Sequence, residues 1–260
     1  MTMSFVRVRQ AGESLAELLW PTRCVGCNLP GELLCEDCRA SLPWICQRWA
    51  CPVCGAPHGW LTCTECGRSR NRDKGAEQTD GLGPAWPTRA VICSLPFRGV
   101  GAAMVSSLKD AHELRLAPVM AAAMACSLDE ARAWDAPDGL PRFDPFRTDA
   151  LCFVPATPAA YARRGFDHME LVSSALSQFI EIPLFDVLAR VDARDQRALG
   201  KKERAKNLAG TVRVVGDVRG LHMLLVDDVI TTGASIGESA RALLDQGAAS
   251  VTACALARVC

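Results

Sequence analysis

Eight cysteines near the start of the 260-residue chain are spaced like metal ligands. They form four pairs, each with two intervening residues: Cys24 and Cys27, Cys35 and Cys38, Cys51 and Cys54, Cys63 and Cys66. This spacing lets both thiolates of a pair face one metal ion, and two pairs complete a tetrahedral shell of four sulfurs. Redox pairs or merely buried thiols are the alternative, but packing needs seldom produce four such pairs so close together. The sequence predicts two structural zinc ions, without indicating which pairs share one.

A second candidate site begins where an apolar strand meets two acids. Residues 223–226 form the apolar run, Asp227 and Asp228 follow it, and a short loop leads into a predicted helix. A helix N-terminus carries unpaired amides and a partial positive charge, so it binds anions. The acids suit the vicinal hydroxyls of a sugar. An ordinary strand-to-helix turn is the alternative, but the pattern favours a ribose on the acids and a 5′-phosphate on the loop residues Thr231, Thr232, Gly233, Ala234 and Ser235.

Basic residues elsewhere could meet further phosphates. Arg163 and Arg164 stand between a predicted strand and a helix capped by Asp167, where they could bind a diphosphate or form an exposed basic turn. His168 is either a proton donor or a surface residue of the first helical turn. The basic segment 190–213 fits a lid over phosphates, a patch for a polyanion or a solvated helix face.

The elements that would position these residues alternate along the chain. Apolar runs predict strands at 90–95, 151–154, 223–226 and 251–256, and helical patterns are seen at 5–20, 99–108, 114–128, 168–180 and 234–246. Such alternation indicates an α/β fold with a parallel sheet covered on both faces. We expect a zinc-ribbon module at 18–67, a linker at 68–88 and the α/β domain at 89–260.

Bulk composition limits the functional classes. Lys and Arg number 29, as do Asp and Glu, so no overall field draws the chain to nucleic acid or to a membrane. No apolar run is long enough for a membrane span, and the N-terminus lacks the apolar region of a secretion signal. We therefore expect a cytoplasmic protein, in which closely spaced cysteine pairs bind metal rather than form disulfides.

Together these motifs resemble the ComF family, in which a cysteine-rich zinc region precedes a type I phosphoribosyltransferase domain. The stretch 224–235 is similar to the family's ribose-phosphate signature. Residues 154–157 resemble its pyrophosphate loop, and residues 163–168 resemble its Arg-Gly-Phe-Asn-Gln box, with Asp-His in place of Asn-Gln. Weaker matches are a Gln…Arg-x-x-Asn box and an aromatic-x-Gly with a lysine, at Asp195, Gln196, Arg204, Asn207, Phe97, Gly99 and Lys109.

The resemblance implies that the chain binds phosphoribosyl pyrophosphate with Mg²⁺. The ribose hydroxyls would lie on Asp227 and Asp228, the 5′-phosphate in the loop 231–235, and the diphosphate near Arg163 and Arg164. The implied chemistry is displacement of pyrophosphate from the anomeric carbon by a nitrogenous base or amine, with no catalytic residue identified.

Members of the ComF family are associated with competence, the handling of incoming single-stranded DNA. The resemblance therefore implies a role in DNA uptake and natural transformation, with single-stranded DNA and competence proteins as partners. An active phosphoribosyltransferase of nucleobase or nucleotide metabolism, with no DNA role, is the alternative.

Overall fold

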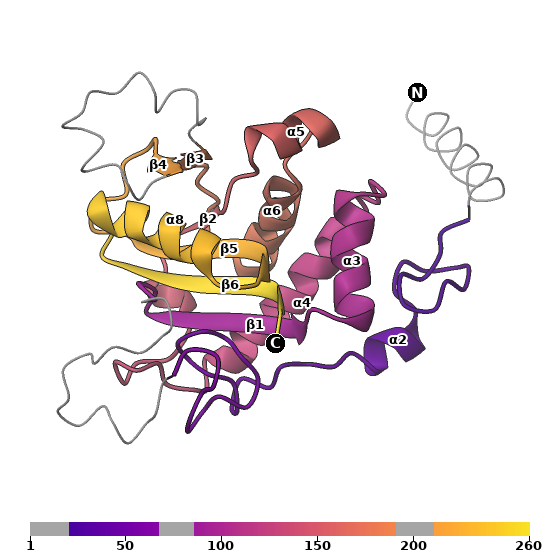
Figure 1. The fold of residues 1–260 in the computed structure, drawn as a ribbon, viewed down its shortest axis with the longest axis horizontal. Helices are drawn as coiled ribbons and strands as arrows, with labels where there is room; N and C mark the ends of the chain where they lie inside the picture. The colour runs from indigo at the N-terminus through magenta and orange to yellow at the C-terminus, as the bar shows by residue number, and fades with distance from the viewer. Residues whose placement is uncertain (1–20, 68–85, 191–210) are drawn as a thin grey trace, which may run out of the picture. The chain divides into compact units, whose positions relative to one another are not determined.

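The computed structural model describes residues 21–67, 86–190 and 211–260 (Figure 1). The chain divides into two compact units, Met1–Leu42 and Pro43–Cys260. The second group of cysteines therefore belongs to the same unit as the α/β elements, and the domain boundaries expected from the sequence stay a prediction. The expected helix at 5–20 and most of the expected linker lie outside the described residues. None of the helices described is both long and apolar enough to cross a membrane.

In the first unit, the described residues form turns and one short helix, α2 (Glu36–Ala40). A bridge between Arg23 and Pro30 closes the loop that carries Cys24 and Cys27. Cys35 stands at the N-cap of α2. The loop and the helix start thus hold the two cysteine pairs of this unit.

The second unit is built on a four-stranded parallel sheet. The strands lie in the order β1 (Ala90–Pro96), β6 (Ser250–Arg258), β5 (His222–Ile230) and β2 (Ala150–Phe153). All four strands are almost wholly buried, as expected for a parallel sheet covered on both sides. The α/β fold with a parallel sheet, predicted from the sequence, is confirmed.

Helices cover both faces of this sheet (Figure 1). Successive side chains of a strand point to opposite faces. Leu225 and Ala253 share one core with Ala240 of α8 (Ala234–Asp245). Ser94 points to the opposite face of the sheet. Its hydroxyl donates to the carbonyl of Ala123 in α4, so α4 covers that face. That face also carries two more helices, so its three helices are α3 (Gly99–Lys109), α4 (Leu116–Ala131) and α6 (His168–Ile180).

Several elements differ from the sequence-based expectation. The strand expected at 223–226 extends to Ile230, because β6 beside it is nine residues long and pairs with it throughout. The residues before His168 form a short helix, α5 (Pro158–Arg164), which Thr157 caps. A 3-10 turn (Pro145–Arg147) and a small antiparallel pair, β3 (Leu188–Arg190) with β4 (Val212–Val214), were also not expected.

Irregular chain covers both edges of the sheet. Along β1, Val91 N donates to the carbonyl of Pro52 at 2.9 Å, and Ile45 N donates to the carbonyl of Ser94 at 2.8 Å. The segment 183–185 bonds to Leu151 of β2 in a similar way. Neither edge strand therefore presents a free row of backbone groups over these residues.

Candidate functional site: a ribose-phosphate loop and two four-cysteine clusters

The acids Asp227 and Asp228 lie within β5, at a level that β2 does not reach. The last pair between β2 and β5 joins Phe153 to Val226, so β5 continues without that neighbour from Asp227 onward. Both carboxyl groups are largely buried. The sequence predicted that the two acids follow the strand. In the structure they are part of it, because the pairing of β5 with β6 continues past them to Ile230. They nevertheless stand at the carboxyl end of the sheet, where ligands bind in open α/β folds.

Asp228 is held by two basic side chains from the helices on its face. Its Oδ2 lies 2.6 Å from Nε2 of His168, at the start of α6, and also forms an ion pair with Nζ of Lys109, the last residue of α3. The ring of His112, just after α3, packs edge-on against Phe166 with 5.6 Å between centroids. That contact keeps the end of α3, and so Lys109, beside the start of α6.

The two acids have opposite electrostatic surroundings. Burial raises the pKa of Asp227 well above its usual range, and the neighbouring charge of Asp228 adds to this effect. Burial also acts to raise the pKa of Asp228, but the hydrogen bond from His168 and the charge of Lys109 outweigh it and lower that pKa to about 2. Asp228 is therefore the acid that is fixed as a carboxylate.

The arginine pair lies in the last turn of α5. Nη1 of Arg164 is 3.2 Å from Nδ1 of His168, so Arg164 is linked to Asp228 through one imidazole ring. Arg163 is exposed. Asp167 fixes this corner, because its carboxylate accepts from the amides of Ala156 and Met169 at 2.7 and 2.9 Å. The structure thus brings Arg164 to the acids, and it shows no contact of Arg163 with them.

The loop 231–235 forms the N-terminus of α8. Gly233 is the N-cap and adopts a left-handed conformation, with φ of 82°. Its carbonyl accepts the first helical hydrogen bond, from Gly237 N at 2.8 Å. The amides of the first turn consequently have no helical partner, and that of Ala234 donates to Oγ1 of Thr232 at 3.4 Å. Thr231 and Ser235 add further hydroxyl groups to the same short loop. This is an anion-binding geometry.

His168 and Lys109 have a larger role in the site than the sequence indicated. His168 was weighed as a surface residue, yet it is buried. Lys109 was singled out only because it matches the position of a lysine in the family that the sequence resembles, yet it forms an ion pair with Asp228. The residues Asp195, Gln196, Arg204 and Asn207 lie outside the described part of the chain.

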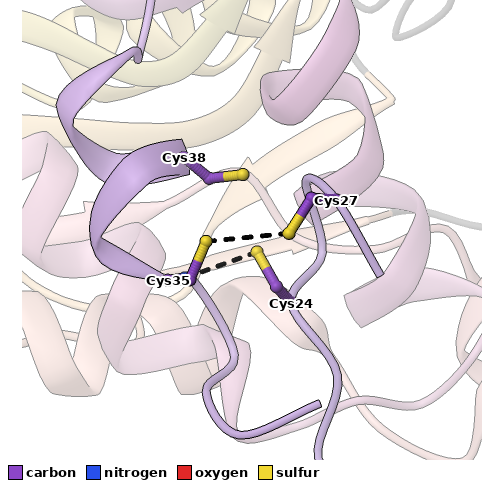
Figure 2. A group of neighbouring side chains, drawn as sticks. All are labelled: Cys24, Cys27, Cys35 and Cys38. Atoms are coloured by element: carbon purple, nitrogen blue, oxygen red, sulfur yellow. Dashed lines mark hydrogen bonds between the residues drawn. The ribbon is translucent and has the colours of Figure 1, made fainter. Parts of the chain in front are cut away.

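The first four-cysteine cluster gathers neighbouring pairs in sequence. The sulfurs of Cys24, Cys27, Cys35 and Cys38 all lie within 4.8 Å of one another and face a common centre (Figure 2). The Sγ atoms of Cys27 and Cys35 are 3.7 Å apart. The amides of Gly26 and Cys35 donate to Sγ of Cys24 at 3.4 and 3.3 Å.

The second four-cysteine cluster has the same form. It contains Cys51, Cys54, Cys63 and Cys66, with Sγ distances of 3.7 Å between Cys51 and Cys66 and 3.5 Å between Cys54 and Cys63. Four sulfurs about 2.3 Å from one zinc ion would be separated by roughly 3.8 Å, so both clusters fit a tetrahedral metal. Each metal would thus be shared by adjacent pairs, which the sequence left open.

In the first cluster the pKa of Cys24 is lowered, whereas those of Cys35 and Cys38 are raised. Burial acts to raise the pKa of Cys24, but the backbone amides of Cys35, Cys27 and Gly26 lower it to about 6. Metal ligands must be thiolates. Amides directed at the sulfur favour that form before any metal arrives.

Two cavities lie away from these sites. One, of about 160 Å³, is lined by the first residues of β5 and β6, such as His222 and Ser250, at the amino end of the strands. The other, of about 530 Å³, lies between the ends of α4 and α6 and the 3-10 turn. Neither includes a residue of the loop 231–235.

Comparisons with known proteins agree with these features. Residues 160–259 match the phosphoribosyl transferase domain family. A protein of Salmonella typhi called DNA utilization protein YhgH is 29 % identical over 92 % of this chain and 97 % of its own. The protein of that name from Escherichia coli K12 is 26 % identical, also over 92 % of this chain and 97 % of its own.

Two more distant likenesses concern parts of the chain. A ribose-phosphate pyrophosphokinase of Synechococcus elongatus is 42 % identical over 66 residues, which are 25 % of this chain and 20 % of that protein. A solved Trypanosoma cruzi hypoxanthine phosphoribosyl transferase covers 56 % of this chain and 66 % of its own at 14 % identity, with a TM-score of 0.32, too loose for a comparison of sites.

The predicted combination of parts is therefore present. The phosphoribosyl transferase match lies in the unit with the parallel sheet, and both four-cysteine clusters precede the matched residues 160–259 in the sequence. The DNA utilization relatives match nearly the whole length of the chain. The chain has a type I phosphoribosyltransferase fold, and its resemblance to the ComF family is confirmed.

Proposed function

We propose that the chain binds phosphoribosyl pyrophosphate at the carboxyl end of β5 and transfers its phosphoribosyl group. The observation that carries this proposal is the loop 231–235, which opens α8 and is separated by two residues from a pair of buried acids. The 5′-phosphate would accept from the amides and hydroxyls of the loop. The ribose hydroxyls would donate to Asp227 and Asp228, and the diphosphate would lie toward Arg163 and Arg164.

The charge pattern suits displacement at the anomeric carbon. The bond from this carbon to the diphosphate oxygen breaks while a bond to an acceptor nitrogen forms. The proton that this nitrogen loses goes to the departing diphosphate or to water. Positive charge develops on the ribose, so a carboxylate fixed in its charged form, as Asp228 is, stabilises the transition state. Mg²⁺ bound with the substrate would neutralise the diphosphate. His168 and Lys109 hold Asp228 in place from α6 and α3.

Both four-cysteine clusters would hold zinc, because four thiolates at tetrahedral spacing are a shell that zinc prefers. Each shell is closed and leaves no position for a substrate. The role of the metal would then be to fold the cysteine turns.

A melting-temperature measurement tests the substrate. Phosphoribosyl pyrophosphate with Mg²⁺ should stabilise the protein by about 2.7 kcal/mol at a hundredfold excess over Kd, because only the folded state binds it. Thr232→Val should weaken the effect, since it deletes a donor and keeps the shape. Glu170→Gln, on the exposed side of α6, serves as the control. No shift in the wild type at millimolar ligand would overturn the proposal.

A role in DNA handling is a second candidate, supported by the name of the relatives, DNA utilization protein. The segment 190–213, which is mostly outside the described residues, holds the basic charge that would bind a polyanion. Single-stranded DNA should then bind with a log affinity that falls linearly with log salt, because counterions are released. Absence of binding at low salt, together with pyrophosphate release on adding free nucleobases, would favour the metabolic enzyme with no DNA role.

A further inference from the structure

Arg258 is a buried arginine that joins the second four-cysteine cluster to the ribose-phosphate loop. It stands at the end of β6 and is 3 % exposed. Its Nε donates to the carbonyl of Cys54 at 3.0 Å, and its Nη1 donates to the carbonyl of Thr231 at 2.6 Å and to that of Ile230 at 3.2 Å. Its Nη2 lies 3.8 Å from the carboxylate of Glu65, between the last two cysteines. One guanidinium thus contacts both cysteine turns and the first residue of the loop.

Trp86 makes a second connection between the same two places. Its ring lies so close to Gly233 that a Cβ on this glycine would overlap the ring carbon Cη2. The ring also packs against the apolar cluster formed by the cysteines and Ala56. The left-handed turn of the loop is therefore supported by an indole ring that itself rests on the cysteine turns.

The cysteine turns need a metal to keep this arrangement. Residues 51–66 form turns and bends rather than helix or strand. Apart from Ala56, the fully buried members of their apolar cluster are cysteines. These turns bury little apolar area of their own, so the metal would supply much of the free energy that fixes their conformation. Without the metal, the Cys54 carbonyl would leave Arg258, and Trp86 would lose the surface behind it.

We propose that Arg258 and Trp86 are positioning residues that make binding of the 5′-phosphate depend on the metal in the second four-cysteine cluster. The inference rests on the proposed function, because it concerns the same loop. It assigns the second cluster a role in ligand affinity, beyond the folding of its own turns. The first cluster, in the other compact unit, would have no such role.

Matched cysteine variants of the full chain test this. Cys54→Ser with Cys63→Ser removes the second metal, and Cys27→Ser with Cys35→Ser removes the first, as metal content per chain will verify. Ribose 5-phosphate reports on the loop, whereas inorganic pyrophosphate reports on the arginine end of the site. We expect the second-cluster variant to lose about tenfold in affinity for ribose 5-phosphate, which is the size of effect that the loss of one charge-assisted hydrogen bond has. Its affinity for pyrophosphate should not change. The first-cluster variant should bind both ligands as the wild type does.

Two further variants keep the test valid if the second-cluster variant does not fold. Arg258→Met removes the donors and keeps the length, and Trp86→Phe keeps an aromatic ring, so the first should lose affinity for ribose 5-phosphate and the second should retain most of it. Arg219→Met is the control, because Arg219 is exposed and pairs only with Asp217 among the described residues.

Two results would overturn the inference. One is unchanged ribose 5-phosphate binding in the second-cluster variant and in Arg258→Met. The other is an equal loss for both ligands, because it would indicate general destabilisation. A wild type that binds neither ligand would instead overturn the proposed function.

Discussion

At the residue scale, the adjacent acids Asp227 and Asp228 should have opposite effects on stability. Asp227 is buried beside a negative charge, so its carboxylate is unfavourable in the folded state. Asp227→Asn keeps the oxygen that accepts from Asp228 N and removes the charge. We expect a gain of about 1 kcal/mol in the free energy of unfolding at neutral pH. Asp228→Asn removes the charge that binds His168 and Lys109 and should lose about 2 kcal/mol. Urea unfolding measures both, and both variants should bind phosphoribosyl pyrophosphate more weakly.

The pH dependence follows from the two pKa shifts. The folded-state pKa of Asp227 is raised, so its unfavourable contribution is absent below the unfolded-state pKa of about 4 and grows as the pH rises above it. The gain from Asp227→Asn should therefore shrink between pH 7.5 and pH 5. The folded-state pKa of Asp228 is lowered to about 2, so its favourable contribution is complete above pH 4 and is lost as the pH falls toward 2. A gain for Asp227→Asn that stayed constant with pH would contradict this account.

Chemistry that lies within one short segment could be predicted from the sequence, and chemistry assembled from distant segments could not. The acids, the loop and the cysteine spacing were visible because each is local in sequence. The partners of Asp228 come from α3 and α6, and nothing near Lys109 or His168 in the sequence indicates that they meet. Arg258 could be predicted even less, because its partners are distant in sequence. Thr231 and Ile230 are 27 and 28 residues away, and Cys54 is 204 residues away.

At the element scale, the turn between β5 and α8 should tolerate no side chain at Gly233. Its φ of 82° costs an alanine about 1–2 kcal/mol, and the Cβ would in addition meet the ring of Trp86. Gly220→Ala is the matched control, because Gly220 has φ of 73° and open space around a Cβ. We expect Gly233→Ala to lower the melting temperature more than Gly220→Ala and to weaken ribose 5-phosphate binding. Equal losses of stability would mean that the contact with Trp86 is unimportant.

The bounds of helices and strands were predicted well where a continuous apolar pattern marks the whole element. They were predicted less well where pairing with a distant strand sets the length. Helix α6 has the bounds expected from its apolar stripe, and Asp167 caps it as expected, since its side chain accepts from Met169 N. Strand β5 was predicted too short, because acids in a strand are disfavoured locally and only the ladder with β6 carries the chain past them. Helix α5 was missed because its seven residues begin with a proline and include no buried side chain.

At the scale of the whole molecule, we expect two zinc ions per chain. Elemental analysis of the purified protein should give a value near two, and each double cysteine variant should lower it by one. The structure supports independent sites, because each four-cysteine cluster draws all its ligands from one compact unit. Protein that contained no metal and had its thiols oxidised in pairs would contradict this prediction.

The segment that covers β1 also occupies hydrogen-bonding groups along that edge of the sheet. An uncovered edge strand presents unpaired amides and carbonyls, to which strands of other molecules add. Residues 90–95 of β1 are buried and uncharged, so a bare edge here would have the composition of an aggregation-prone segment. Pro52, which accepts from Val91 N, lies directly after the first cysteine of the second cluster. Stripping the metal from this cluster would therefore open a template for intermolecular β-pairing, and the protein would be lost as aggregates as well as through unfolding.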